Sequence, residues 1–349
     1  MDTEDYKVAK ETKAENLKEN SNVEDVLNHG YAHSQQINYL FVGLARAAGF
    51  EAAELYIAPR NAGIFIPTRN EVRQLSDELV WVHAGTQDYF LDPAARYFPF
   101  GLLPWYETAT GGFRIDKRGG TQVATPEPAP SDSETIRNAD LEVKDDGSVE
   151  GVIQVDFTGQ RAALLREEKR KEDETGRIKD FENDVKSWLP VGAVFKIVKV
   201  ANWDDNNQPI HIEGTLTMPS FATSAPQRML MPLEMFQSTQ QSAFAAEKRV
   251  NVVYFSYPYE EVDDIKIRLP ATFKVETAPS DRTVNLGAVS YQITAAASGN
   301  TVEVKRNLTE KGTFFTKDEY PALRKFFGVV KTGDNAQMVI RNAQPAKAN

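Results

Sequence analysis

The chain has 349 residues, which is enough for two domains of ordinary size. Hydrophobic residues make up 41% of it, so well-formed cores are expected and global disorder is not. The net charge of −10 leaves no basic surplus, which argues against nonspecific binding to nucleic acid or to anionic lipid. The chain has no cysteine, which excludes disulfides, thiolate metal sites and a thiol nucleophile.

Other classes of function are excluded by missing patterns. No apolar run approaches the roughly 18 to 20 residues that span a bilayer, so no membrane span is expected. The charged N-terminus cannot serve as a signal peptide as it stands. Phosphate loops and dinucleotide fingerprints are missing, so no cofactor is expected. The four histidines lack any HxxxH or HxH spacing, so no metal site is expected; they are His29, His33, His83 and His211.

The first part of the chain predicts a helix followed by a strand. From Gln35 onward, apolar residues recur at helical spacing until Gly49 ends the pattern. Small residues occupy the rest of this helix, so we expect it to be central and packed on more than one side. The following segment FEAAELYIAP alternates through Ala53, Leu55 and Ile57, which predicts a strand.

The segments LVWVHA and DYFLDP, separated by Gly-Thr-Gln, predict a β-hairpin. With the turn centred near Thr86 and Gln87, Asp92 is expected opposite Trp81. His83 then shares the face of Asp92 but lies two residues nearer the turn.

A change of composition predicts two domains. Residues 117–136 are rich in Gly, Pro, Ser and Thr and are expected to be a linker. Residues 137–349 contain many short strand patterns, which predict an antiparallel β-sandwich-like domain. One long helix is expected at about 160–189, and its charged block REEKRKEDE should form a solvated face. The segment EYPALRKFFGVVK predicts a closing helix.

Two motifs of the first part carry a family resemblance. The stretch GYAHSQQINYLFVGLARAAGF, with Arg46, Ala47 and Gly49, and the stretch DYFLDP, with Asp92 and Pro93, resemble the transglutaminase-like branch of the papain-type superfamily. More narrowly, the chain resembles bacterial multidomain proteins with β-rich domains of unknown function on either side of such a core. The resemblance implies an α+β transglutaminase-like domain at 1–116, truncated at its N-terminus relative to the family.

The resemblance also implies a catalytic cysteine, histidine and aspartate, and the first two are replaced here. Counting back from Gly49 along the helix, the family's cysteine falls on Ser34. Counting back 15 residues from Asp92, its histidine falls on Asp77. Only Asp92 keeps the family residue, so no catalytic residues are expected at these degenerate triad positions.

Ser34 has two interpretations. A serine hydroxyl needs a well-placed general base before it can attack a substrate. If Asp77 is its partner, Ser34 is inert and serves as a helix N-cap. The alternative is a triad of Ser34, His83 and Asp92. The predicted hairpin register displaces His83 from Asp92 by about 6 to 7 Å, which weakens this alternative.

The sequence therefore predicts a pseudoenzyme: a non-catalytic transglutaminase or protease homologue that binds protein, peptide or cell-wall material. The alternatives are a serine-dependent hydrolase or acyltransferase and a purely structural scaffold module. By family analogy we expect the protein in the bacterial periplasm or cell envelope.

Overall fold

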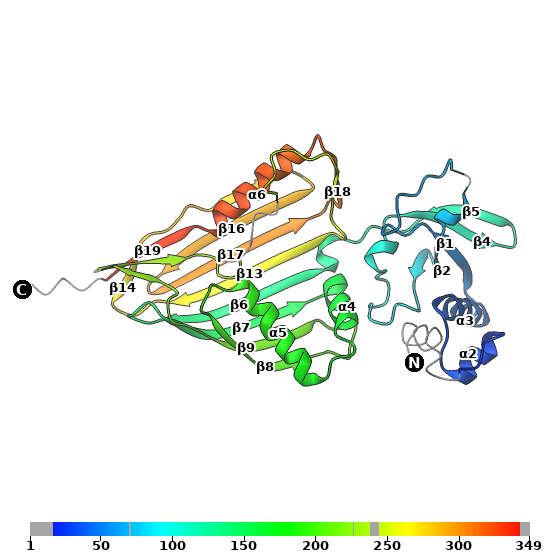
Figure 1. Ribbon diagram of the computed structural model, residues 1–349, viewed down its shortest axis with the longest axis horizontal. Coiled ribbons are helices and arrows are strands. Elements are labelled where there is room, and N and C mark those ends of the chain that lie inside the picture. Colours follow the sequence, from blue (N-terminus) through cyan, green and yellow to red (C-terminus); the bar gives the residue numbers. More distant parts are fainter. Residues whose placement is uncertain (1–16, 70, 226, 238–243, 343–349) are drawn as a thin grey trace, which may run out of the picture. The chain divides into compact units, whose positions relative to one another are not determined.

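A computed structural model of the chain describes residues 17–69, 71–225, 227–237 and 244–342 (Figure 1). The first 16 residues of the domain predicted at 1–116 lie outside this description. The chain forms two compact units, Met1–Pro128 and Ala129–Asn349. Both units are built mainly from antiparallel sheets with few helices, so the predicted α+β class is confirmed.

The first unit is a five-stranded antiparallel sheet in the order β3-β2-β1-β4-β5. A short helix and a longer one precede the sheet, and two 3-10 turns lie in the connections between its strands. The elements are α2 (Val23–His29), α3 (Ser34–Ala47), β1 (Glu51–Ile57), η1 (Val72–Gln74), β2 (Asp77–Ala84), β3 (Gln87–Leu91), η2 (Trp105–Glu107), β4 (Gly111–Asp116) and β5 (Gly119–Ala124).

Each face of this sheet has its own small core. On one face, Val42 of α3 packs with Val80 and Val82 of β2. On the other face, Leu79 of β2 packs with Leu55 of β1 and other apolar side chains. These two clusters establish which residues of β2 point toward α3 and which point away from it.

One prediction for this unit is wrong, and a second is correct only in part. Helix α3 is not central: only Asn38 and Val42 are buried along it, and Leu44 is 54% exposed, because within the described residues the sheet covers one side of the helix. The boundary between the two units, after Pro128, lies within the predicted linker 117–136, but this segment is not all loop, since Gly119–Ala124 forms β5. This edge strand is almost wholly exposed, which explains its low apolar content.

The second unit is built on an eight-stranded sheet in the order β15-β16-β17-β13-β6-β7-β9-β8. All neighbouring pairs are antiparallel except β6 and β13. The strands are β6 (Glu134–Val143), β7 (Val149–Phe157), β8 (Val194–Ala201), β9 (Ile210–Met218), β13 (Tyr259–Arg268), β15 (Arg282–Asn285), β16 (Val289–Ser298) and β17 (Thr301–Glu310).

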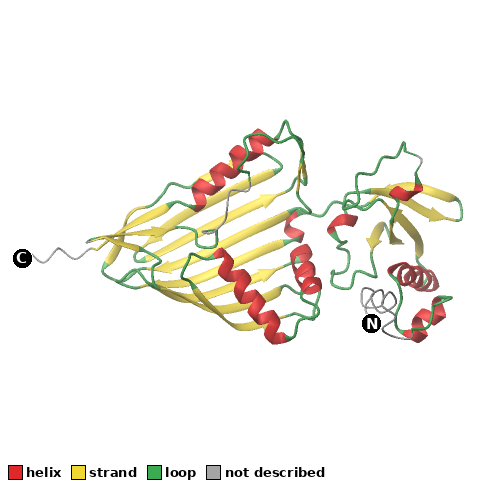
Figure 2. Ribbon diagram, viewed as in Figure 1, coloured by secondary structure: helices red, strands yellow, loops and turns green. Residues whose placement is uncertain are grey.

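One face of the large sheet is covered by helices and by a smaller sheet (Figure 2). The helices and the four-stranded sheet β10-β11-β19-β14 share one hydrophobic core with it, so the arrangement is more than two facing sheets. These elements are η3 (Pro130–Asp132), α4 (Gly159–Glu168), α5 (Glu174–Trp188), α6 (Tyr320–Asp334), β10 (Thr223–Ala225), β11 (Arg228–Pro232), β14 (Phe273–Thr277) and β19 (Gln337–Asn342), with a separate pair β12 (Val253–Tyr254) and β18 (Phe314–Phe315). Helix α6 confirms the predicted closing helix.

The single helix predicted at 160–189 is wrong, because the structure has two helices there. Helix α4 ends before Lys169, whose side chain is only 7% exposed and pairs with Asp180 at 3.3 Å. Asp173 then caps α5 by accepting a hydrogen bond from the backbone nitrogen of Gly176 at 2.7 Å. An N-cap within the charged block therefore starts a second helix where the sequence pattern predicts one continuous helix.

The charged block is also not a uniformly solvated face. Arg166 is 1% exposed, and its guanidinium donates hydrogen bonds to four backbone carbonyls in the loop between β8 and β9. The accepting oxygens are those of Trp203, Asn202, Asp205 and Gln208, all 2.8 to 2.9 Å away. Arg166 therefore fixes this loop against α4.

Replacing Arg166 with methionine should lower the free energy of unfolding by about 2 to 4 kcal/mol, because several buried carbonyl groups lose their donors. The exposed Lys171, changed to methionine, is the matched control and should cost less than about 0.5 kcal/mol. Urea unfolding of the two variants measures the difference. Equal costs would show that Arg166 does not hold the loop.

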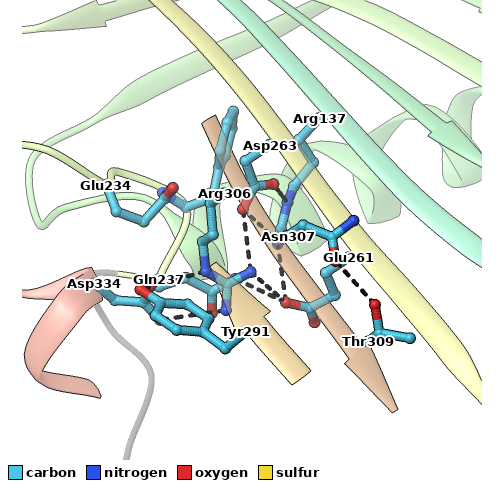
Figure 3. Close-up of polar contacts among 11 residues, drawn as sticks. Arg137, Glu234, Gln237, Glu261, Asp263, Tyr291, Arg306, Asn307, Thr309 and Asp334 are labelled. Atoms are coloured by element: carbon cyan, nitrogen blue, oxygen red, sulfur yellow. Dashed lines mark hydrogen bonds and ion pairs between the residues drawn. The ribbon is translucent and has the colours of Figure 1, made fainter. Parts of the chain in front are cut away.

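A buried charge network lies on the covered face of the large sheet (Figure 3). Arg137 of β6 donates to Asp263 of β13, with 3.1 Å between Nη2 and Oδ2. Arg306 of β17 donates to Asp334 of α6 at 2.8 Å and to Glu261 of β13 at 2.9 Å. These contacts tie three strands of the sheet to the end of α6.

Candidate functional site

Ser34 is the first residue of α3, and its side chain is exposed. The N-cap is the preceding residue, His33, which has an extended backbone (φ −70°, ψ 156°). The backbone nitrogen of His33 donates to Oε1 of Gln36 at 3.3 Å, as in a capping box. The N-cap therefore lies one residue before the predicted position, and the Ser34 hydroxyl has no hydrogen-bond partner among the described residues.

The first turn of α3 lies against the beginning of β2. Asn38 donates from Nδ2 to the carbonyl oxygen of Glu78 at 2.7 Å. Gln35 donates from Nε2 to Oε1 of Glu78 at 2.6 Å. The carboxylate that approaches the turn containing Ser34 is therefore that of Glu78. Burial raises the pKa of this carboxyl group, and the charges of Glu54 and Asp77 add to the effect.

Asp77 points away from α3. In the register of β1 and β2, Glu78 is opposite Tyr56, whereas Asp77 is opposite Ile57. Because successive side chains of a strand alternate between faces, Asp77 shares the face of Leu79, which packs in the core remote from α3. The structure therefore brings Glu78, not Asp77, to the side of the sheet on which Ser34 lies.

Asp77, Asp92 and Glu107, the last residue of η2, form an acidic cluster. Asp92 follows β3 and accepts a hydrogen bond from the backbone nitrogen of Ala94 at 2.9 Å. Burial, together with the charge of Asp77, raises the pKa of Asp92 to about 6. Burial and the charge of Asp92 hold the pKa of Glu107 well above its usual range, and the two carboxyl groups share a hydrogen bond. Protonated Glu107 is thus the donor and ionised Asp92 the acceptor.

The first unit should become less stable as the pH rises from about 4 to 8. In the folded state Asp92 and Glu107 have pKa values above those of the unfolded chain, so folding binds protons in this window and stability is lost as they dissociate. Glu107→Gln keeps a donor for Asp92 but cannot ionise, so the loss of stability with rising pH should be smaller in this variant. Amide hydrogen exchange of β1 to β3 at several pH values measures this. An unchanged pH dependence in Glu107→Gln would contradict the shared proton.

His83 and Asp92 are not brought together. The observed register places Trp81 opposite Phe90, because the turn consists of Gly85 and Thr86 alone. The predicted register, with Asp92 opposite Trp81, is wrong by two residues. Asp92 follows Leu91, which is opposite Val80, so it lies about 13 Å along the strands from His83.

His83 has a different carboxylate partner. Its Nδ1 lies 2.7 Å from Oδ1 of Asp88, the residue directly opposite it across the hairpin. Both side chains are substantially exposed, at 39% and 49%. The alternative triad of Ser34, His83 and Asp92 is therefore not assembled in the structure.

Sequence reasoning missed Glu78 and Glu107. Glu78 was missed because the count of fifteen residues back from Asp92 ends on its neighbour Asp77, which lies on the opposite face of β2. The alternation of buried residues in β2 is the signal that assigns Glu78 to the α3 face. Glu107 lies in an irregular, aromatic segment, where no periodicity predicts which side chain turns inward.

The described residues hold no group of three or more His, Cys, Asp or Glu side chains that could bind a metal ion. None of the helices in the described part of the chain is both long enough and apolar enough to cross a membrane.

Part of the chain is similar to a described protein family, and most of it is similar to a solved structure. Residues 227–340, less than half of the chain, are similar to a family described as a domain of unknown function with a solved structure (DUF3858). A crystal structure from Parabacteroides distasonis ATCC 8503, described as a "putative protease", matches at 13% identity with a TM-score of 0.48. The match covers 91% of this chain and 46% of that protein, so the chain spans about half of its length. The comparison with curated proteins gave no match.

Proposed function

We propose that the first unit is a transglutaminase-like domain that has lost its catalytic chemistry and now binds protein, peptide or cell-wall material. The observation that carries the proposal is the set of side chains that lie around Ser34. The side chain that β2 places against its helical turn is the carboxyl group of Glu78. Asp77 and Asp92 lie in the acidic cluster with Glu107.

This arrangement supports a non-catalytic role because a serine hydroxyl attacks only when a base removes its proton. In serine enzymes an imidazole does this and is itself oriented by a carboxylate. The histidine of the hairpin, His83, is paired with Asp88 at the turn. The order of α3, β1, β2, β3 and Asp92 matches the order that the resemblance implies, which supports the family assignment.

The location in the bacterial periplasm or cell envelope belongs to the same proposal and depends on the resemblance alone. The serine-dependent alternative is less favoured because His83 is about 13 Å along the strands from Asp92. A scaffold role without a ligand remains the other alternative, and binding of envelope peptides or cell-wall fragments distinguishes it from the proposal.

Ser34→Cys alone should give no thiol-dependent acyl transfer. A cysteine at the start of α3 would gain from the helix N-terminus, but β2 places the carboxyl group of Glu78, not an imidazole, against this turn. Release of the leaving group from a peptide ester, with and without a thiol-blocking reagent, measures this. The wild-type chain, which has no cysteine, is the control. Turnover that the blocking reagent abolishes would overturn the proposal.

A further inference from the structure

The second unit has a pocket of about 360 Å³ on the covered face of its large sheet. This volume falls within the range of sites for small molecules. The inward side chains of β6 and β13 form its floor, including Thr135, Arg137 and Glu261. Its walls come from three other segments: the end of β7 with α4, the end of α5, and the segment that leads into β13. All of these residues belong to the second unit.

The walls are mainly aromatic and are supplied by Phe157, Trp188, Phe255, Tyr257 and Tyr259. Aromatic walls provide a large apolar contact area with a preferred flat shape. The hydroxyl groups of Tyr257 and Tyr259 make no hydrogen bond within the described part of the chain. They are therefore available to a ligand at the edges of an apolar slot.

Arg161 supplies a positive charge that no carboxylate of the described residues neutralises. Its guanidinium lies over the ring of Phe157, 5.8 Å from the ring centroid. The other arginine of the pocket, Arg137, is already paired with Asp263 and Glu261 and is only 2% exposed. Arg161 is therefore the cation that a ligand can engage, and a guanidinium matches the geometry of a carboxylate.

The pocket also contains one acceptor, Glu261, whose two oxygens differ. Oε2 accepts from Arg137, Arg306 and Gln237 at 2.9 to 3.3 Å. Oε1 accepts from none of the described residues, and the side chain is 26% exposed. Oε1 can therefore accept a hydrogen bond from an N–H or O–H group of a ligand.

These features argue against a cationic ligand. Arg161 covers the face of Phe157, and Arg137 lies over Trp188 at 5.3 Å, so two aromatic faces already have cations. A second cation would meet both guanidinium groups, whereas Glu261 is already paired with two arginines. The unbalanced charge of the pocket is positive.

We propose that this pocket binds an N-acylated aromatic amino acid, either as a free molecule or as the C-terminal residue of a peptide. The carboxylate would pair with Arg161, the ring would lie among the aromatic walls, and the amide N–H would donate to Oε1 of Glu261. The site lies in the second unit and does not depend on the function proposed for the first.

Calorimetric titration of the full chain with N-acetyl-phenylalanine, its carboxamide and Gly-Gly-Phe tests the proposal. The acid should bind at least tenfold more tightly than the carboxamide, which lacks the negative charge. Tighter binding of Gly-Gly-Phe than of N-acetyl-phenylalanine would identify the C-terminus of a peptide as the ligand. Tighter binding of N-acetyl-phenylalanine would identify a free molecule. No binding of either acid at millimolar concentration, or equal binding of acid and carboxamide, would overturn the proposal.

Two variants assign the binding to this pocket. Arg161→Gln should weaken binding of the acid at least tenfold and leave the carboxamide unaffected. Arg268→Gln is the matched control, because Arg268 is 44% exposed and pairs with Asp140 on the opposite face of the sheet. Tyr257→Phe, which removes one hydroxyl, should weaken binding about fivefold without altering the fold. Unchanged binding by folded Arg161→Gln would overturn the assignment.

Discussion

Replacing Arg306 with methionine should lower the free energy of unfolding of the second unit by about 3 to 5 kcal/mol. Arg306 is 2% exposed and donates to Asp334, Glu261 and Asp263 at 2.8 to 3.2 Å. Removing Arg306 leaves these carboxylates without a compensating charge, and two of them, Asp263 and Asp334, are buried. Urea unfolding followed by amide hydrogen exchange of β13, β16 and β17 measures the loss.

The matched control is the neighbouring residue on the same strand. Lys305 points to the other face and pairs with Asp264 at 3.1 Å, with side chains that are 64% and 44% exposed. Lys305→Met should therefore cost less than about 1 kcal/mol. The deficit of Arg306→Met should also shrink in acid, because protonation neutralises the stranded carboxylates. Equal costs for the two variants would show that the network does not stabilise the fold.

A double replacement that restores both the cysteine and the histidine implied by the family resemblance should give the introduced thiol a lower pKa than in the single Ser34→Cys variant. The expected decrease is about two pH units. In Ser34→Cys with Glu78→His, the imidazole would stand where Glu78 now contacts the first turn of α3. An imidazolium there stabilises the thiolate, whereas the carboxylate disfavours it. The thiolate absorbance across a pH series gives the value, and the chain has no other cysteine to interfere.

Ser34→Cys with Asp77→His is the control that distinguishes the two assignments of the histidine position. Asp77 shares the face of Leu79 and belongs to the acidic cluster with Asp92 and Glu107. Its replacement should therefore leave the thiol pKa within about half a pH unit of the single cysteine variant. A larger drop with Asp77→His than with Glu78→His would restore the assignment made from residue counting.

The sequence predicts the helices and strands of the first unit better than it predicts their register and packing. Periodicity identifies α3, β1 and the hairpin, and Gly49 marks the end of the helix. The register depends on the number of residues in the turn, and a two-residue turn moves Asp92 from opposite Trp81 to beyond Leu91. The partner of Ser34 then depends on which face of β2 meets α3, and that is decided by packing.

Long-range pairing explains most of what the sequence does not predict in the second unit. The charged block at 166–174 suggests a solvated helix, but the carbonyls that bury Arg166 lie 36 to 42 residues further along the chain. Arg137 and Asp263 are 126 residues apart and meet because β6 and β13 pair in parallel. No local pattern indicates that such residues face inward.

Treatment of the wild-type chain with a fluorophosphonate probe tests most directly whether Ser34 has a working base. Because β2 places Glu78 rather than a histidine against the first turn of α3, and His83 pairs with Asp88 at the hairpin turn, we expect no covalent labelling. Mass spectrometry of the intact chain should find the unmodified protein at neutral pH. Labelling of the wild type that disappears in Ser34→Ala, with the fold unchanged, would contradict the non-catalytic function and favour the serine-dependent alternative.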